Sequence, residues 1–248
     1  MSSVILTSYF TKKPHPNLPN DPNVVGRGDD GFVRNDDFSY IQEWYGSILK
    51  NNLNGYIFHD NLSDSFIDKY GNKNVTFLKV EDSPYSNNDY RFFCFRNFLK
   101  HKEFDYVFHT DVSDVVVVKD PEGLIKNHNN FNFYACRDSI KISEFPYLYI
   151  HEKNNWVDKM KILLNSNRWD LINMGVVGGN HHDMLMFYDN FCRIRKEMQD
   201  ESFNANMWIC QYLLRLVFSD KKTMVGSPVC SDFKKYQKNR RDVYFIHK

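Results

Sequence analysis

Short apolar runs, rich in β-branched and aromatic residues, alternate along this chain with longer segments in which apolar residues recur every three or four positions. The runs predicted to be strands are 4–10, 55–60, 75–80, 106–111, 115–118, 131–138, 171–179 and 243–247. Helical spacing covers 38–49, 90–101, 156–165, 182–198 and 203–218. This alternation is typical of an α/β domain built on a mainly parallel sheet with flanking helices.

The chain is long enough for one large domain. It has 248 residues, of which 42% are hydrophobic and 16% aromatic, so it can bury a sizeable core. No internal repeat, Gly/Ser linker or low-complexity tract divides it. We therefore expect a single domain over residues 1–248. Because the sequence stops directly after a predicted strand, it can also be one domain cut from a longer polypeptide.

Composition excludes several classes of partner. The formal net charge is +1, from 32 basic and 31 acidic residues, so no global field attracts nucleic acid or an anionic membrane. No apolar run approaches the length of a membrane span, and the amino terminus lacks the apolar core of a secretory signal, which predicts a cytoplasmic protein. The cysteines are odd in number and never spaced as C-x-x-C, so we expect reduced, mostly buried thiols at Cys94, Cys136, Cys192, Cys210 and Cys230.

Polar residues follow several of the early strands. The segments "TSYFT", "HDNLSD", "VEDSP" and "HTDVSD" each pass from apolar to polar residues on the downstream side. In an open α/β sheet the ligand crevice lies at the carboxyl ends of the strands. We therefore expect these four segments to converge on one site.

Two aspartates interrupt the most apolar part of the chain, "DYVFHTDVSDVVVVKDP" at 105–121. In a continuous strand, positions three apart point to opposite faces, so Asp111 and Asp114 can meet only if the chain turns at Val112 and Ser113. Two carboxylates at a strand end form a hard-oxygen site for a divalent cation, which can hold the phosphates of a substrate. The structural alternative is an Asp-rich loop with Asp114 solvated.

Three further features favour the cation site. The aspartates lie between two apolar strands, and "INMGVVGG" places Gly175, Gly178 and Gly179 where a ligand can approach the backbone. The chain closes with "VYFIHK", which puts His247 after a final strand. Imidazole beside two carboxylates suits Mn²⁺ better than Mg²⁺ or Ca²⁺, with Mg²⁺ as the alternative.

Taken in order, these segments resemble the glycosyltransferases of the GT-A fold that carry a D-x-D or D-x-x-D metal motif. The pattern is similar to the glycosyltransferase domain of lysyl hydroxylases and related viral and bacterial enzymes. The resemblance rests on the opening strand, "GYIFHDNLS", "DYRFFCFRNFL", "TDVSDVVVVKDP", "NMGVVGG" and the terminal "IH". It implies a single GT-A domain that transfers a hexosyl group from a nucleotide sugar, most commonly a UDP-sugar, to a hydroxyl of a glycan.

The resemblance also implies roles for individual positions. Asp111, Asp114 and His247 would hold Mn²⁺ against the donor diphosphate. Donor binding would fall to Thr7, Ser8 and Tyr9 at the nucleoside, Asp89 and Arg91 at the sugar or diphosphate, and Lys248 near the phosphates. The floor between donor and acceptor would be lined by Asn173, Gly178 and Gly179. Structural alternatives stay open: Arg91 as a helix-surface cation, Tyr9 as core, and Asn173 as the partner of a buried carbonyl.

The stereochemical outcome is less constrained. Inversion requires a carboxylate base on the acceptor hydroxyl. Asn206 stands where related enzymes often carry an acid, which favours retention. The carboxylates that could still serve as a base are Asp138, Asp170, Asp183, Asp200 and Glu201.

Other classes fit the sequence less well. A nucleotidyltransferase needs a Gly-rich phosphate loop after the first strand, whereas "TSYFTKKPHPNLP" has none. A haloacid-type phosphatase needs D-x-D-x-[TV] after an early strand, whereas the aspartates here are three apart and lie in the middle of the chain. A dinucleotide oxidoreductase needs G-x-G-x-x-G, which "GVVGG" does not match. A catalytically silent sugar-binding module of the same fold remains an alternative, although the intact acid pair argues against it. The sequence does not predict the acceptor. Acceptor pockets in such enzymes are built from variable loops, and the candidate loops here, 11–37 and 138–156, contain no recognisable motif.

Overall fold

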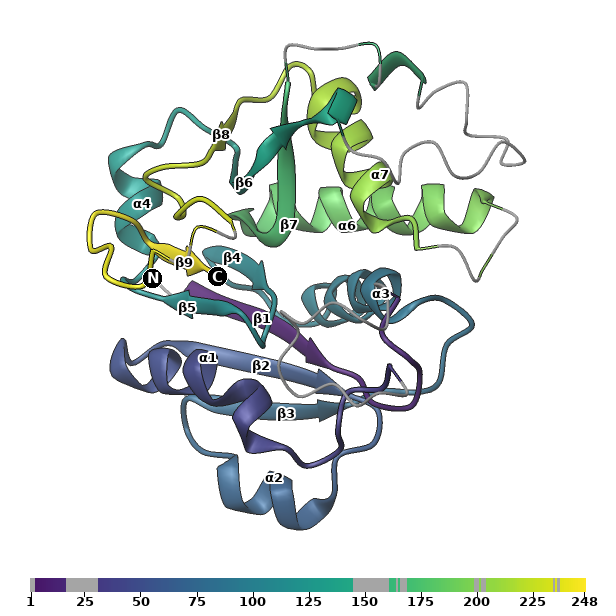
Figure 1. Cartoon of the computed structure of the whole chain (residues 1–248), viewed down its shortest axis with the longest axis vertical. Helices are drawn as coiled ribbons and strands as arrows, with labels where there is room; N and C mark the ends of the chain where they lie inside the picture. Colours follow the sequence, from purple (N-terminus) through teal and green to yellow (C-terminus); the bar gives the residue numbers. More distant parts are fainter. Residues whose placement is uncertain are drawn as a thin grey trace.

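A seven-stranded sheet forms the centre of the molecule (Figure 1). The computed structural model describes residues 3–16, 31–144, 161–163, 165, 169–198, 201, 204–233, 235 and 237–248. The strands follow the order β3 (Val75–Lys79), β2 (Asn54–His59), β1 (Ser3–Tyr9), β4 (Tyr106–Thr110), β7 (Asp170–Asn180), β6 (Phe133–Lys141) and β8 (Thr223–Val225). This architecture confirms the predicted α/β class.

The sheet is parallel at one end and mixed at the other. Strands β3, β2, β1 and β4 run parallel, as expected of right-handed crossovers through helices. Strand β7 runs antiparallel to both β4 and β6, and β8 runs parallel to β6. The reversed direction of β7 decides which of its residues reach the carboxyl end of β4.

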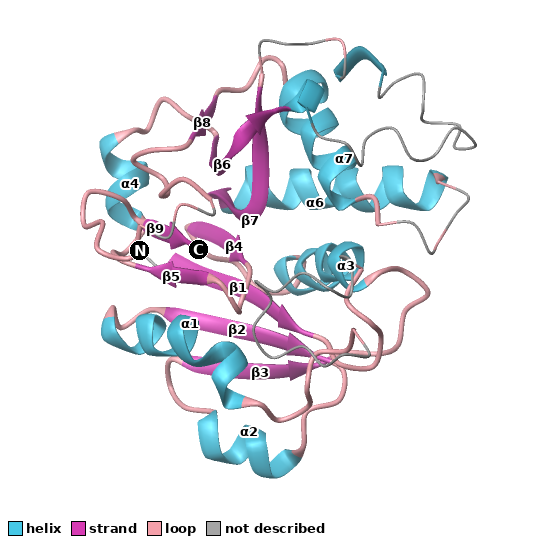
Figure 2. Cartoon of the chain, viewed as in Figure 1, coloured by secondary structure: helices cyan, strands magenta, loops and turns pink. Residues whose placement is uncertain are grey.

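Helices cover both faces of the sheet (Figure 2). One face packs against α3 (Asn87–Leu99), α6 (His181–Glu197) and α7 (Asn206–Tyr212), which continues as a π-helical turn, Leu213–Val217. The other packs against α1 (Phe38–Lys50), α2 (Asp64–Tyr70) and α4 (Glu122–Asn127). Strand alternation explains the two cores, since Val4 and Leu6 face the first helix set and Ile5 the second.

A second, two-stranded sheet lies beside the carboxyl end of β4. The chain leaves β4, turns at Val112–Asp114 as the sequence predicted, and enters β5 (Val115–Val117). Strand β5 pairs antiparallel with β9 (Phe245–His247), so that Val115 lies opposite His247. The last strand of the chain is thereby brought to the acidic turn.

Two of the five cysteines form a disulfide, which corrects the expectation that all are reduced. Cys136 on β6 is bonded to Cys230, 94 residues later, with the Cα atoms 5.4 Å apart. Cys94, Cys192 and Cys210 are buried free thiols, as expected. Spacing along the chain could not reveal the pair because β6 and the segment before β9 meet only through the tertiary fold.

Some elements differ from the sequence prediction. Helices α2 and α4 and strand β8 are short and were not expected, because seven, six and three residues carry too little periodicity. The helix expected at 156–165 falls mostly outside the described residues.

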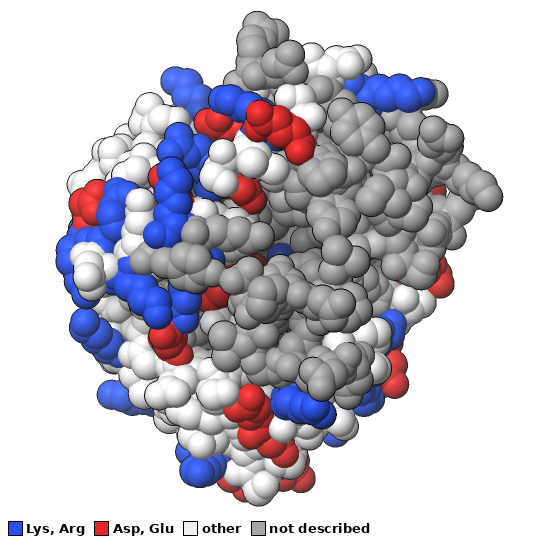
Figure 3. Space-filling view, in the orientation of Figure 1, with Lys and Arg blue, Asp and Glu red and all other residues white. Residues whose placement is uncertain are grey.

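The molecular surface carries both signs of charge. On the face drawn in Figure 3, acidic side chains lie among the basic ones, which gather on the side where α4 and β9 lie. No helix in the described part of the chain is long and apolar enough to cross a membrane.

Candidate active site

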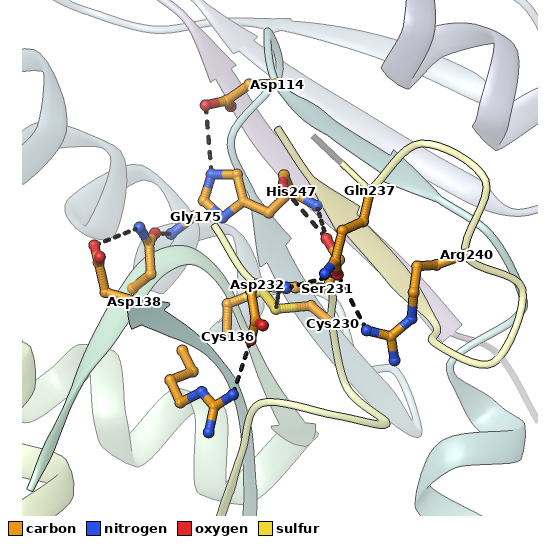
Figure 4. Close-up of a disulfide and its surroundings, with 12 residues drawn as sticks. Asp114, Cys136, Asp138, Gly175, Cys230, Ser231, Asp232, Gln237, Arg240 and His247 are labelled. Atoms are coloured by element: carbon orange, nitrogen blue, oxygen red, sulfur yellow. Dashed lines mark hydrogen bonds and ion pairs between the residues drawn. A yellow bond between two sulfur atoms is a disulfide. The ribbon is translucent and has the colours of Figure 1, made fainter. Parts of the chain in front are cut away.

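Asp111, Asp114 and His247 form a cluster at the carboxyl end of β4, named here the cation cluster. Each residue offers a ligand atom, and these atoms all lie within 4.8 Å of one another. The Nε2 atom of His247 is 3.4 Å from Oδ2 of Asp114 (Figure 4). Two carboxylates and one imidazole on a shared centre are a suitable ligand set for a transition-metal cation.

Backbone pairing places the three side chains. The ladder between β4 and β7 continues to Asp111, whose N–H donates to the carbonyl of Gly175 at 2.9 Å. After the turn, the carbonyl of Asp114 accepts a hydrogen bond from the Lys248 N–H at 3.0 Å. The acidic turn is therefore fixed on one side by β7 and on the other by the end of the chain.

Gly175 provides the space in which the cluster assembles. A Cβ atom at this position would lie 2.6 Å from Nε2 of His247 and 2.9 Å from Oδ2 of Asp111. Both distances are below van der Waals contact, so any side chain would displace the ligand atoms. The sequence predicts close approach of a ligand at Gly175, Gly178 and Gly179 alike, whereas the resemblance places only the last two at the floor of the site.

Arg91 neutralises one carboxylate of the cluster, that of Asp111. It projects from α3, is only 5% exposed, and forms an ion pair with Asp111, while its Nη2 donates to the Met174 carbonyl at 3.5 Å. Burial acts to raise the pKa of Asp111, but the charges of Arg91 and His247 outweigh it and lower that pKa. Asp111 is thus held as a carboxylate, and Arg91 is not the helix-surface cation of the structural alternative.

His247 lies in a buried, acidic environment. Its side chain is 1% exposed. Burial alone would lower its pKa, but Asp114, and to a smaller extent Asp111 and Asp138, raise that pKa above the usual value. The negative potential that attracts a proton here would equally attract a divalent cation.

Unpartnered polar atoms in the cluster fit a bound metal ion. Three buried atoms have no hydrogen-bond partner among the described residues: the two ring nitrogens of His247 and Oδ1 of Asp114. Buried polar atoms are normally satisfied, so exceptions call for a ligand. The residues present therefore fit the Mn²⁺ expected from the sequence.

Asp138 and Asn173 flank the cluster on the side of β6 and β7. The amide of Asn173 donates to Oδ2 of Asp138 at 3.4 Å, and its oxygen accepts from the Gly175 N–H at 2.8 Å (Figure 4). Lys248 lies on the opposite side, where its ammonium is paired with Glu43 on α1. Asp138 acts on His247 electrostatically and Asn173 binds the Gly175 N–H, whereas Lys248 contacts the turn through its backbone N–H.

Two of the last three residues of β1, Thr7 and Tyr9, have structural partners. Thr7 is buried and donates to the Thr110 carbonyl at 2.8 Å, which ties β1 to β4. Tyr9 is fully buried, and its hydroxyl donates to the Arg34 carbonyl at 2.6 Å. The core alternative for Tyr9 therefore holds, and its ring is not available for stacking on a nucleoside. Ser8 is partly exposed.

Asp89 is also held away from the cluster. It is fully buried in an ion pair with Arg195 on α6, at 2.7 Å, and accepts from the Ala205 N–H at 3.1 Å. These contacts join α3 to α6 and α7. The carboxylate thus packs the helices together and has no atom directed at the cation cluster.

Gly178 and Gly179 lie within the sheet. A Cβ atom on Gly178 would overlap the ring of Phe108, and one on Gly179 would lie 2.5 Å from the Asn132 carbonyl oxygen. Because β7 is antiparallel to β4, these glycines pair with Phe108 and Val107, upstream of the site. They permit close strand packing, and Gly175 is the glycine that faces the ligands.

Comparison with solved structures places this geometry in a known fold. The chain superposes on an active-site mutant of LgtC with a TM-score of 0.52 and 12% identity, covering 98% of this chain and 86% of the other. A complex of the galactosyltransferase LgtC with donor and acceptor sugar analogs gives a TM-score of 0.51 and 14% identity, with the same coverage. The chain has a GT-A glycosyltransferase fold.

The comparisons of sequence find no match. No protein-family model matches the chain. No curated protein matches it either. The similarity to LgtC therefore establishes the fold, and the function has to be argued from the site.

Proposed function

We propose that this protein is a metal-dependent glycosyltransferase that moves a hexosyl group from a UDP-sugar to a hydroxyl of a glycan. The observation that carries this proposal is the cation cluster, with its unpartnered ligand atoms, at the carboxyl end of β4 in a GT-A fold. In folds of this kind, the crevice at the carboxyl ends of the strands is where ligands bind. The solved structure of LgtC with donor and acceptor sugar analogs supports the same class of substrates.

The cluster would hold Mn²⁺ through one oxygen from each of Asp111 and Asp114 and a ring nitrogen of His247. A cation bound there stabilises the negative charge that develops on a diphosphate leaving group, typically by several kcal/mol. Arg91 keeps Asp111 ionised for that role. Lys248 supplies a second positive charge next to the turn, and a phosphate can replace Glu43 as its partner.

The imidazole ligand favours Mn²⁺ over Mg²⁺. Mg²⁺ prefers oxygen ligands in regular octahedral geometry, whereas imidazole nitrogen suits the transition metals. Mg²⁺ should therefore support slower turnover at equal concentration.

The acceptor side is formed by Asp138 and Asn173, and the proposed outcome is retention of the anomeric configuration. Two of the other candidate bases have cationic partners: Asp170 is paired with Lys141, and Asp183 with Lys221 at 2.8 Å. Glu201 is exposed, and Asp200 lies outside the described residues. Asn206, in place of an acid, is buried at the start of α7. Asp138 would then orient the acceptor hydroxyl. Proton NMR of the product measures its anomeric configuration and so tests the proposed retention.

Nucleotide release provides the test. UDP- and GDP-sugars are screened for release of the nucleotide with Mn²⁺, with Mg²⁺ and with a chelator. We expect release from a UDP-sugar that requires Mn²⁺ and stops on chelation. Asp111→Asn and Asp114→Asn should each lower the rate by at least about tenfold, since each removes a charged ligand. Asp68→Asn, at an exposed carboxylate on α2, serves as the matched control.

Two outcomes would overturn this proposal. Release at full rate in chelator, with both aspartates replaceable, excludes the metal mechanism. Saturable binding of UDP-sugars without any release, across a broad acceptor panel, would instead identify a sugar-binding module that has lost turnover.

A further inference from the structure

The backbone of His247 is held by a single buried side chain, Ser231. The Ser231 hydroxyl accepts a hydrogen bond from the His247 N–H at 2.9 Å and donates to the His247 carbonyl at 3.3 Å. The Ser231 N–H in turn donates to the Phe245 carbonyl at 3.0 Å. Ser231 is completely buried, so water does not compete for these contacts.

The disulfide fixes Ser231 from the other side. Cys230 precedes Ser231 and is bonded to Cys136 on β6 (Figure 4). Cys136 lies opposite Asn173 on β7, two residues before Gly175. A continuous connection therefore runs from the floor of the cation cluster through the disulfide and Ser231 to His247.

Such a connection matters because the segment that carries the disulfide is also the neighbour of β9 on the side away from β5: the Phe245 N–H donates to the Val229 carbonyl at 2.9 Å, and Cys230 forms a β-bridge with Phe245. The strand has three residues and pairs with the three residues of β5, and both lie outside the main sheet. The imidazole has no hydrogen bond among the described residues that would fix its ring. The orientation of a metal-ligating histidine is usually set by such a bond. Here the ring packs against Phe233, with the centroids 4.3 Å apart, and lies 3.4 Å from Asp114, so its placement depends strongly on the position of the backbone.

We propose that Ser231 and the Cys136–Cys230 disulfide are positioning groups that hold His247 at the cation cluster and thereby set its affinity for the metal. The inference rests on the proposed function, because it requires the cluster to bind a divalent cation. Nothing in it requires the disulfide to open during turnover.

The experiment measures Mn²⁺ affinity by electron paramagnetic resonance, with thermal unfolding recorded in parallel. Ser231→Ala should weaken binding by about 10- to 100-fold, the usual effect of losing a group that orients a ligand. Ser231→Thr keeps the hydroxyl and should restore most of the affinity.

The disulfide is tested by a double variant, Cys136→Ala with Cys230→Ala, which should also weaken binding. Its matched control is Cys94→Ala with Cys192→Ala, which removes two buried sulfurs that are not bonded to each other. That control should change the melting temperature without changing Mn²⁺ affinity. If Ser231→Ala does not fold, the comparison of these two double cysteine variants still tests the inference.

A background variant separates positioning from a general loss of structure. If Ser231 acts through the imidazole, Ser231→Ala has no further effect on Mn²⁺ affinity once His247→Ala is present. Equal losses in both backgrounds would overturn the inference, as would unchanged affinity in the Ser231→Ala and double cysteine variants. Wild-type protein that binds no Mn²⁺ would instead refute the metal site of the proposed function.

Discussion

Gly175 is a position at which the site has no room for a side chain. In Gly175→Ala the new methyl group would occupy the space of His247 Nε2 and Asp111 Oδ2, at 2.6 and 2.9 Å. We expect Mn²⁺ affinity and nucleotide release to fall at least about tenfold, the range seen when ligands are misplaced. Equilibrium binding and the release assay measure both effects.

Gly46 offers a matched control, because a Cβ atom there meets nothing within 4 Å on helix α1. Gly46→Ala should leave binding unchanged and stabilise the fold slightly, through the better helix propensity of alanine. Unaltered Mn²⁺ affinity in Gly175→Ala would show that the cluster tolerates a methyl group and that its geometry is not as described.

His109 carries a pH dependence that can be isolated. Burial, followed by the charge of Arg91, lowers its pKa to about 3. The unfolded chain binds a proton at this residue below about pH 6.5, whereas the folded chain does not until about pH 3. The free energy of unfolding therefore falls as the pH falls through this window, because unfolding takes up about one proton at this residue.

Replacing this side chain should remove that dependence. Chemical unfolding of His109→Gln between pH 7 and 4 should show a shallower loss of stability than wild type. His101→Gln, at an exposed position, should keep the wild-type slope. An identical slope in His109→Gln would mean that the histidine is protonated in the folded protein.

The three cluster residues were predictable from the sequence because each ends or directly follows an apolar run. Asp111 and Asp114 break two runs that have no other reason to stop, and His247 closes the last one. Tyr9 was ambiguous for the same reason, since an aromatic residue at a strand end fits a core and a ligand equally. Ser231 left no signal, because a lone serine in a loop has no pattern.

Strand β7 shows where a one-dimensional pattern fails. Its glycines end an apolar run, and in a parallel sheet that end would face the crevice. The strand runs antiparallel, so its carboxyl end faces the other edge and Gly175, in its middle, meets Asp111. No residue within β7 encodes the direction in which the strand runs.

The link between β6 and the segment before β9 gives a covalent prediction. The unfolded, unreduced protein should react with a thiol-alkylating reagent at three of its five cysteines, Cys94, Cys192 and Cys210. After reduction all five should react, and peptide mass mapping should assign the two additional sites to Cys136 and Cys230. Five reactive thiols before reduction would show that this disulfide is absent from the isolated protein.

The architecture as a whole was the most predictable property. Strand and helix periods alternate over most of the chain, and the longer helices of the described part contribute apolar residues to one or the other of the two cores. The resemblance to GT-A enzymes is confirmed at the level of the fold, at 12% identity to LgtC. Packing needs only apolar residues of the right period, whereas a site needs particular atoms, so a fold persists after sequence similarity has disappeared.

The fold brings two distant parts of the chain, the turn at Asp111–Asp114 and His247 at the end of β9, together in the cation cluster. Crystals grown with MnCl₂ and UDP, measured at the manganese absorption edge, would locate the proposed Mn²⁺ ion without any assumption about turnover. We expect one anomalous peak within bonding distance of Asp111, Asp114 and His247, with the UDP diphosphate on its open side. A peak elsewhere, or none while UDP is bound, would contradict a metal-dependent transferase built on this cluster.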